Sequence, residues 1–329
     1  MKTELLKRYD LFFGASSKEK LLESQKKYSS NKFIRINLSK SNPEKIDQFL
    51  KENKVQYSKT FLPNSLKIEK TFFNLSSSVE NISAKIYLQD LASQIPINLI
   101  DFNELALKHS SSKTLCPTPY ALCSVLDMAA SPGSKTTQIA DLLKFHKIPY
   151  NITALEPEKK RLLKLINNLQ KQKVNNIKII NIAAENFISK EKFDIILLDA
   201  PCSGNLIDDK LWLGKRDLKG INEKSALQKK LLENASKLLK ENGILIYSTC
   251  SLEPEENELN ILYAEKNLKL KSIKQNTIIF PFETSPSKLI KDKNLLEKIQ
   301  NQNSIRIMPY LSQTQGFFVC ILKKSNVYS

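Results

Sequence analysis

The chain is poor in glycine, cysteine and histidine. Its 329 residues include seven glycines, five cysteines and two histidines. The cysteines are odd in number and form no C-x-x-C pair, so neither a disulfide framework nor a zinc site is indicated. His109 and His146 lie in no recognisable motif, which argues against histidine-based triads and zinc hydrolases. We therefore expect no metal, and any nucleophile must be activated in another way.

Long apolar runs are also absent. The N-terminal segment MKTELLKRYD lacks the apolar core of a signal peptide. No apolar run approaches the ~18 residues that are needed to span a bilayer. Free thiols fit a reducing compartment. We expect a soluble, cytoplasmic and monomeric protein.

Arginine is scarce, although the chain is strongly basic. It has 51 Lys+Arg against 34 Asp+Glu, a formal charge of +17. Such an excess favours a polyanionic partner, because each neutralised phosphate releases counterions. The excess is spread along the chain in a Lys-, Asn- and Ile-rich composition, so we give it limited weight. It favours a nucleic acid over an acidic membrane.

The hydrophobic pattern changes near residue 110. Residues 1–110 alternate lysine-rich helical patterns with strand-like runs such as KFIRINLSK, which predicts a smaller α+β domain. The segment SSSKTLCPTPY is typical of a loop. Residues 111–329 alternate strands with helices, which predicts a parallel, doubly wound α/β sheet whose ligands bind at the carboxyl ends of its strands. The expected strands are 124–128, 151–155, 176–180, 193–199 and 243–248, and the expected helices are 3–10, 18–28, 43–53, 135–144, 157–173 and 223–240.

Two features follow the first two strands of this sheet. Gly133 lies in DMAASPGSKT, where small residues let backbone approach a ligand closely. The loop matches neither G-x-G-x-x-G nor the Walker spacing, and an ordinary turn is the alternative. Glu156 ends the second strand, where a carboxylate can bind both ribose hydroxyls of an adenosine-type cofactor. Its alternative role is that of a carboxylate at a helix N-terminus, worth a few tenths of a kcal/mol; we favour the ribose.

Two cysteines follow two later strands. FDIILLDAPCSG brings Asp199 and Cys202 to the ligand edge of the sheet, and GILIYSTCSLEPEEN brings Cys250 there. A free cysteine is usually a small buried hydrophobe. Two cysteines at the ends of two strands, each followed by Ser, favour a chemical role instead. The structural interpretation is kept for Cys116, Cys123 and Cys320.

These motifs resemble the Nop/Sun family of RNA cytosine-5 methyltransferases, particularly its archaeal-type tRNA members. The paired PC and TC cysteines are the most specific feature. KFIRINLSK is similar to the family's R-x-N segment, which usually belongs to a small RNA-binding domain. The resemblance covers about residues 85–323, through YLQDLAS, DMAASPGSKTTQIA, the helix from Glu156 to Asn168, LLDAPCSG, LQKKLLENASKLLKENG, YSTCSLEPEENE and GFFVCILKK.

The resemblance implies a Rossmann-like domain that uses S-adenosylmethionine. It implies that Cys250 is the nucleophile and that Cys202 assists elimination. Carbon 5 of cytosine is too electron-poor to attack a methyl sulfonium until a thiolate adds at carbon 6, which is covalent catalysis. DNA cytosine methyltransferases use the PC cysteine as nucleophile, so the reverse assignment stays open.

The remaining site residues are expected around the base and the cofactor. Asp199 is suited to accept a hydrogen bond from the exocyclic amine or to share a proton with the ring nitrogen. Lys135 is a candidate for the positive charge that stabilises a thiolate. A structural ion pair is the alternative for both. The cofactor contacts implied by the motifs are Ala129, Ala130, Ser131, Pro132, Gly133, Ser134, Lys135, Glu156 and Asp199.

The sequence departs from the family pattern at two places. Ala183 stands where the family usually has an Asp that faces the adenine amine, and Glu185 is the nearest substitute. The segment after PCSG lacks the usual Arg and Pro pattern, and substrate contacts there are assigned to Trp212, Lys215 and Arg216.

The expected substrate is RNA in which a cytosine can leave its stack. A lysine-rich, arginine-poor surface fits an RNA that is recognised through shape and loops, and tRNA is favoured. A ribosomal RNA methyltransferase with the same chemistry is the first alternative. A non-catalytic RNA-binding protein is the second, and a DNA methyltransferase is disfavoured because the TC motif is present.

Overall fold

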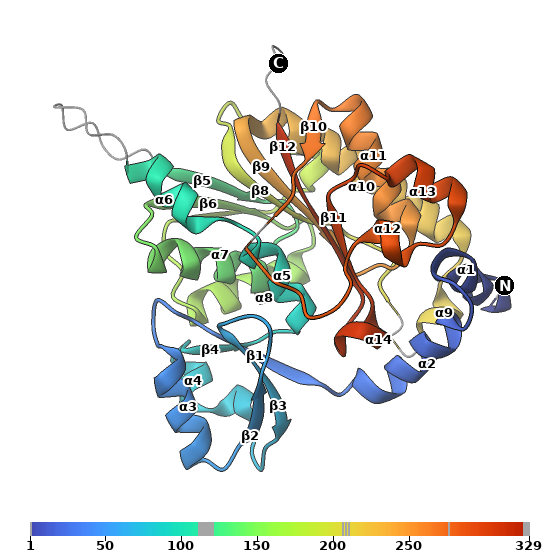
Figure 1. The fold of residues 1–329 in the computed structure, drawn as a ribbon. Helices are drawn as coiled ribbons and strands as arrows, with labels where there is room; N and C mark the ends of the chain where they lie inside the picture. The colour runs from blue at the N-terminus through green and yellow to red at the C-terminus, as the bar shows by residue number, and fades with distance from the viewer. Residues whose placement is uncertain are drawn as a thin grey trace. The chain divides into compact units, whose positions relative to one another are not determined.

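The computed structural model describes residues 2–110, 122–205, 207, 209, 211–275 and 277–324. The chain divides into two compact units. Figure 1 labels the helices and strands of the chain. Unit 1 comprises Met1–Ser30 and Leu198–Ser329, and unit 2 comprises Asn31–Leu197. This division differs from the boundary expected near residue 110, because the first two helices belong with the C-terminal part of the chain. The functional boundary stays a prediction.

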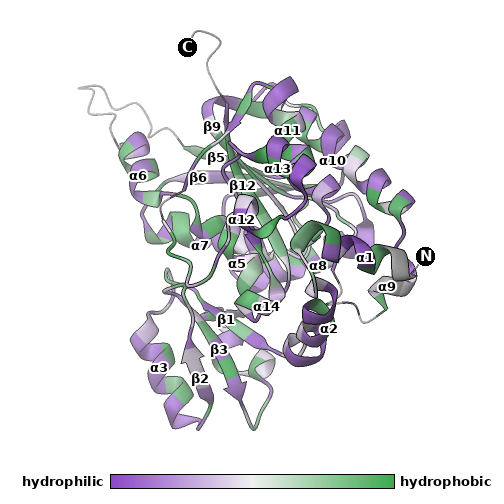
Figure 2. Cartoon of the chain, turned by 45° about the vertical axis from the view of Figure 1, so that its right-hand side comes forward, coloured by the Kyte–Doolittle hydropathy of each residue, from purple (hydrophilic) through white to green (hydrophobic). Residues whose placement is uncertain are grey.

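Unit 2 begins with a small antiparallel sheet of order β2-β3-β1-β4. The helix expected near residue 43 is α3, Pro43–Glu52, which starts where the Asn42 side chain accepts the N–H of Lys45. Its hydrophobic side buries Ile46 and Leu50, and Figure 2 shows the mixture of hydrophilic and hydrophobic residues along it. This part is the expected α+β fold. Its other elements are β1 Lys32–Ile36, β2 Gln56–Lys59, β3 Ser65–Lys70, η1 Leu75–Ser77, α4 Val79–Ile82 and β4 Ile86–Leu88.

The rest of unit 2 alternates strands and helices. Its strands have the order β8-β5-β6-β7 and are parallel, with Val125 opposite both Ile195 and Ile152. The nearly continuous burial of β8 is typical of a strand covered on both faces. The elements are α5 Leu91–Asn98, α6 Phe102–Ser110, β5 Cys123–Asp127, α7 Ser134–Phe145, β6 Tyr150–Leu155, α8 Lys159–Lys171, β7 Ile177–Ile180, η2 Ala184–Asn186 and β8 Phe193–Asp199, whose last two residues lie in unit 1.

Unit 1 contains strands that run antiparallel. β9, Leu239–Thr249, pairs with β12, Phe317–Lys324, which also pairs with β10, Leu270–Ser272, and β11, Ser304–Ile307. The sequence analysis expected parallel strands and did not predict these antiparallel strands β10, β11 and β12. The residue pattern identifies a strand but not its direction, which depends on the path of the connection before it.

The helices of unit 1 enclose a separate hydrophobic cluster. Tyr9, Leu21, Trp212 and Leu252 are among its buried members. The long helix α10 begins at Leu218, earlier than expected, because the Asp217 side chain caps it by accepting the N–H of Gly220. The helices are α1 Lys2–Phe13, α2 Ser17–Tyr28, α9 Trp212–Lys215, α10 Leu218–Leu238, η3 Pro254–Glu256, α11 Glu258–Asn267, α12 Pro286–Leu289, α13 Lys293–Ile299 and α14 Pro309–Ser312.

The structure describes only a small part of one expected loop. Most of the expected loop at 110–120, including Cys116, lies outside the described residues. Within the described ranges, none of the helices combines the length and the apolar character that crossing a membrane requires.

Candidate active site

The residues selected from the sequence fall into two groups, one in each unit. Unit 2 carries the loop Ala129–Gly133, Lys135 and Glu156, and unit 1 carries Asp199 and the two cysteines.

The loop of unit 2 joins β5 to α7. Gly133 precedes α7 with φ of 103°, a left-handed conformation that favours glycine. A Cβ at this position would lie 3.1 Å from Cδ1 of Leu165. The single glycine of the loop is therefore required by its own backbone and by the close approach of α8.

Side chains of α8 and its surroundings hold this loop. The Ser131 hydroxyl donates to the carbonyl of Arg161 (2.8 Å), and Nη2 of Arg161 donates to the carbonyl of Ser131 (3.0 Å). Nδ2 of Asn168 donates to the carbonyl of Pro132 (2.8 Å). Three hydrogen bonds thus fix the conformation of a short loop before any ligand is bound, which lowers the entropy cost of binding.

The end of β5 contributes a residue that the sequence analysis did not select. Asp127 is buried, and its Oδ2 accepts the Thr136 hydroxyl at 2.6 Å. Its Oδ1 accepts the N–H of Ala129 at 3.3 Å. The position of an Asp at the last residue of a ligand-edge strand was the signal that could have identified it. Lys135 precedes Thr136 in the first turn of α7 and is buried.

Glu156 is almost fully buried, with 1% of its surface exposed. Its Oε1 accepts the N–H of Glu158 (2.9 Å), and its Oε2 lies 3.8 Å from Nε of Arg161. One oxygen therefore caps the start of α8, as the alternative interpretation expected. A hydrogen bond between Oε2 of Glu156 and the ribose hydroxyls stays a prediction. Ala183 precedes η2, and Glu185 is exposed there.

The R-x-N segment lies at the end of β1. Arg35 is fully buried and donates to the Ser134 carbonyl (2.9 Å), the Thr137 hydroxyl (3.1 Å) and Oε1 of Gln89 (2.6 Å). Burial lowers the pKa of Arg35 to about 10. Nε of Arg35 also donates to Oδ1 of Asn37 at 3.2 Å. The segment therefore ties the small sheet to the first turn of α7.

In unit 1 the two cysteines meet. Sγ of Cys202 lies 3.2 Å from Sγ of Cys250, and both residues are partly exposed. Cys202 follows the end of β8, and Cys250 directly follows β9. Two thiols in contact can both reach one reacting group, or one can hold a proton that the other releases.

Asp199 is oriented by the strand beside the cysteines. Its Oδ1 accepts the Ser248 hydroxyl at 2.7 Å. The carbonyl of Ser248 in turn accepts the N–H of Ala200 at 2.8 Å. The sequence prediction that Asp199, Cys202 and Cys250 lie together is consistent with these contacts.

A buried carboxylate joins the two cysteine segments. Glu256 is fully buried, and its oxygens accept the N–H of Ser203 (2.9 Å), the Ser203 hydroxyl, the Ser251 hydroxyl (2.9 Å) and Nε2 of Gln228 (2.9 Å). Ser203 follows Cys202, and Ser251 follows Cys250. Glu256 thus holds both cysteine segments from one point, and Gln228 adds a bond to the carbonyl of Pro201 (3.0 Å).

Further acidic residues of the same segment are buried. Oε1 and Oε2 of Glu258 pair with Nε and Nη2 of Arg306 at 2.8 and 2.6 Å, and Nη1 of Arg306 donates to the carbonyl of Leu252 at 2.8 Å. Burial raises the pKa of Glu253 to about 7. The acidic EPEEN run that follows the TC cysteine could have indicated these supporting carboxylates, but the sequence analysis did not interpret it.

The expected substrate contact by Trp212 was wrong. Trp212 is 1% exposed, and its Nε1 donates to the carbonyl of Ser203 at 2.9 Å. Nε of Arg216 donates to the same carbonyl, and Lys215 forms a 3.0 Å ion pair with Asp209. Trp212 and Arg216 therefore support the segment that carries Cys202.

Parallel strands with a glycine-bearing loop, together with paired cysteines, are features of a Rossmann-like methyltransferase. The chain belongs to the family described as 16S rRNA methyltransferase RsmB/F, which matches residues 113–323. This membership confirms the resemblance to the Nop/Sun group.

Named relatives act on two kinds of RNA. The chain is 37% identical over 202 residues to a tRNA (cytosine(72)-C(5))-methyltransferase of Pyrococcus horikoshii, covering 61% of this chain and 46% of that protein. It is 30% identical over 257 residues to a ribosomal RNA small subunit methyltransferase F of Aeromonas salmonicida, covering 76% of this chain and 48% of that protein. The chain thus spans about half the length of these relatives.

A solved structure resembles almost the whole chain. A methyltransferase homologue protein from Pyrococcus horikoshii superimposes with a TM-score of 0.75 and 27% identity, covering 98% of this chain and 97% of that one. This likeness confirms the Rossmann-like fold class with its smaller N-terminal α+β part.

Proposed function

We propose that this chain is an RNA (cytosine-5) methyltransferase that uses S-adenosylmethionine. The observation that carries the proposal is the 3.2 Å separation of the Cys202 and Cys250 sulfurs. A reaction that adds a thiolate to a base and later expels it needs a nucleophile and a group that assists release. Family membership supports the same chemistry.

The residues of unit 2 fit the cofactor. S-adenosylmethionine supplies the methyl group when it is bound. The first residues of α7, Ser134 and Lys135, follow the loop Ala129–Gly133 and offer backbone N–H groups at a helix N-terminus, which suit a carboxylate. Glu156 would bind the ribose hydroxyls through the oxygen that does not cap α8. Asp199 would contribute a further contact near the methyl-accepting base.

Cys250 performs the first step. Its thiolate forms a bond to carbon 6 of cytosine, and the electron pair of the 5,6 double bond moves to make carbon 5 nucleophilic. Asp199, held by Ser248, shares a proton with the ring nitrogen or accepts a hydrogen bond from the exocyclic amine. Either contact relieves the negative charge that develops on the ring. Lys135 supplies positive charge that favours the thiolate.

Cys202 acts in the last step. After carbon 5 is methylated, its proton must be removed so that the double bond can reform and the Cys250 thiolate can leave. Cys202, in contact with Cys250, assists this elimination. The reverse assignment of the two cysteines makes the opposite prediction for trapped adducts. The methyl transfer itself needs no metal ion.

Transfer RNA is the favoured substrate, and ribosomal RNA is the alternative. The Pyrococcus horikoshii relative supports tRNA, and the relatives named for the ribosomal small subunit support the alternative. We further propose that residues 1–110 bind RNA, and that the protein acts in the cytoplasm as a monomer.

An exposed aromatic residue supports the RNA-binding role of the small sheet. Phe72 is 73% exposed, and Nζ of Lys70 lies 5.1 Å from the centre of its ring. A hollow of about 430 Å³ beside it is lined by Lys32, Phe73 and Leu88 among others. An aromatic face flanked by lysines suits base stacking and phosphate contact.

The test is transfer of tritiated methyl groups into total tRNA, total rRNA and DNA of matched sequence, followed by mass spectrometry of the nucleosides. The expected result is label in tRNA, recovered as 5-methylcytidine. Label in rRNA alone would select the ribosomal alternative. RNA binding without any methylation would support the non-catalytic alternative, and equal labelling of DNA would overturn the RNA assignment.

A further inference from the structure

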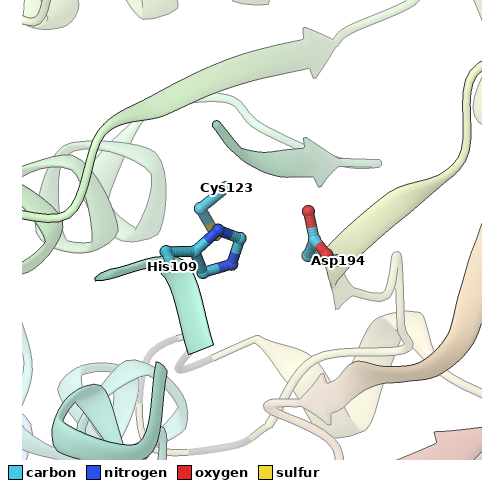
Figure 3. A group of neighbouring side chains, drawn as sticks. All are labelled: His109, Cys123 and Asp194. Carbon is cyan, nitrogen blue, oxygen red and sulfur yellow. The ribbon is translucent and has the colours of Figure 1, made fainter. Parts of the chain in front are cut away.

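Three potential metal ligands converge in unit 2 although they are distant in sequence. They are His109 near the end of α6, Cys123 at the start of β5 and Asp194 near the start of β8. One donor atom of each lies within 4.8 Å of the others, and all three residues are buried. Figure 3 shows the side chains approaching one another from three separate elements.

This cluster is distinct from the proposed cofactor site. β5 and β8 are parallel, and Cys123 and Asp194 lie at their amino-terminal ends. The loop Ala129–Gly133 follows the carboxyl-terminal end of β5, where ligands bind in such sheets. A group bound at the cluster would therefore lie at the opposite edge and serve a structural role.

The carboxylate of the cluster is held in a defined orientation. Oδ2 of Asp194 accepts the backbone N–H of Ser124 (2.9 Å) and the Ser124 hydroxyl (2.8 Å). Nζ of Lys108 lies 3.9 Å from Oδ1. Hydrogen bonds of this kind typically orient metal-binding carboxylates and raise the precision of the site.

We propose that His109, Cys123 and Asp194 bind a divalent zinc ion. Imidazole nitrogen, thiolate sulfur and carboxylate oxygen are all zinc ligands, with bond lengths of about 2.0–2.3 Å. Ligand atoms of a tetrahedral site lie roughly 3.5 Å apart, so each pair of donor atoms needs to approach by up to about 1.3 Å. Binding forms a bond to the Cys123 sulfur, whose proton passes to solvent. The ion would attach the end of α6 to the sheet.

The sequence analysis expected no metal because these residues form no recognisable motif. The ligands come from three elements, and only the parallel pairing of β5 with β8 and the position of α6 bring them together.

The test titrates the full-length protein with Co²⁺ and then Zn²⁺ after purification without a histidine tag. Cys202→Ala and Cys250→Ala are present in every sample, because those adjacent thiols offer a competing site. We expect one Co²⁺ per chain with a thiolate-to-cobalt absorption band that Zn²⁺ abolishes. Cys123→Ser should remove the band and weaken binding at least ~10-fold. Cys320→Ser, which changes another buried cysteine, should leave both unchanged.

Two results would overturn the proposal: absence of the band in the folded protein, or its survival in Cys123→Ser. If circular dichroism shows that the Cys123→Ser protein is unfolded, X-ray absorption of the zinc-loaded protein that carries only Cys202→Ala and Cys250→Ala decides. One sulfur with nitrogen and oxygen ligands supports the site. No sulfur, or two sulfurs, contradicts it.

Discussion

At the scale of single residues, the cysteine pair depends on side chains that hold the residues next to it. Glu256 is the clearest case, because it accepts hydrogen bonds from the residue that follows each cysteine. A buried carboxylate with several donors is costly to disturb, since every donor loses its partner at once. We therefore regard Glu256 as a positioning residue for the proposed reaction.

Glu256→Gln tests this role. The amide would offer N–H groups to the donors Ser203 and Gln228, so we expect the free energy of unfolding to fall by about 1–3 kcal/mol. We expect kcat to fall at least ~10-fold while the KM for RNA changes little, because the binding surface is intact. Thermal unfolding and single-turnover rates measure the two effects. Glu241→Gln, at an exposed site, is the control. An unchanged kcat would reject the positioning role.

Glu253 gives a prediction about pH. Burial raises its pKa from 4.5 to about 7, in a setting formed by Arg8, Tyr9, Glu255 and Glu256. Between pH 4.5 and 7 the folded chain holds a proton that the unfolded chain has released, so this group's contribution to stability is complete at the low end and is lost as pH rises.

Glu253→Gln mimics the protonated form and should remove that loss. Relative to the variant, the natural chain should lose roughly 2–3 kcal/mol of stability between pH 5 and pH 8. Chemical denaturation of both proteins at the two pH values measures it. A constant difference between the two proteins would show that Glu253 is ionised throughout.

The sequence analysis located the site residues at the ends of strands, but it missed the side chains that hold them in place. Asp199, Cys202 and Cys250 follow strands whose hydrophobic runs are visible in the sequence. Glu256 lies in the acidic EPEEN run, but its hydrogen-bond partners Ser203 and Gln228 come from distant segments, and no local pattern reveals that pairing. Trp212 was misassigned because an aromatic residue in a polar loop looks exposed until the packing around it is known.

At the scale of elements, β1 and α7 are linked by one arginine. Arg35 reaches from the small sheet to the Ser134 carbonyl and the Thr137 hydroxyl in the first turn of α7. Its planar group donates in several fixed directions, which a lysine ammonium cannot reproduce. The conformation of the proposed cofactor loop therefore depends on a residue of the small sheet.

Arg35→Lys should weaken this link. We expect about 2–4 kcal/mol loss in unfolding free energy, because buried acceptors lose their donors. We also expect a rise of roughly tenfold in the Kd for S-adenosylmethionine, equivalent to about 1.4 kcal/mol. Denaturation and calorimetry measure these values. Lys32→Ala, on the same strand, is the matched control, and an unchanged Kd in the Arg35 variant would contradict the account.

The positions of several elements were predicted correctly, whereas the start of α10 and the antiparallel direction of β12 were not. The helix at residue 43 and the strands β5 and β8 match their expected positions, because each has a clear hydrophobic period. The start of α10 was missed, because the sequence analysis did not identify Asp217 as the residue that caps the helix. Antiparallel β12 follows from tertiary pairing with β9, which the hydrophobic period does not encode.

At the scale of the whole molecule, a charge of +17 predicts binding that weakens steeply with salt. The exposed Phe72 adds a stacking contribution that salt does not screen. Phe72→Ala should therefore reduce tRNA affinity by ~1–3 kcal/mol while the slope of affinity against salt stays the same. Filter binding at several salt concentrations measures both. Ile188→Ala, at another exposed hydrophobic residue, is the control, and equal losses in the two variants would argue against stacking.

The central claim concerns the division of labour between the two cysteines, and adduct formation tests it most directly. Cys250→Ala, Cys202→Ala and the natural chain are incubated with tRNA and S-adenosylmethionine, and protein–RNA adducts are resolved on denaturing gels. The account predicts no adduct and no methylation for Cys250→Ala, and an accumulating adduct for Cys202→Ala. An adduct that accumulates in Cys250→Ala and is absent in Cys202→Ala would contradict it and exchange the two roles.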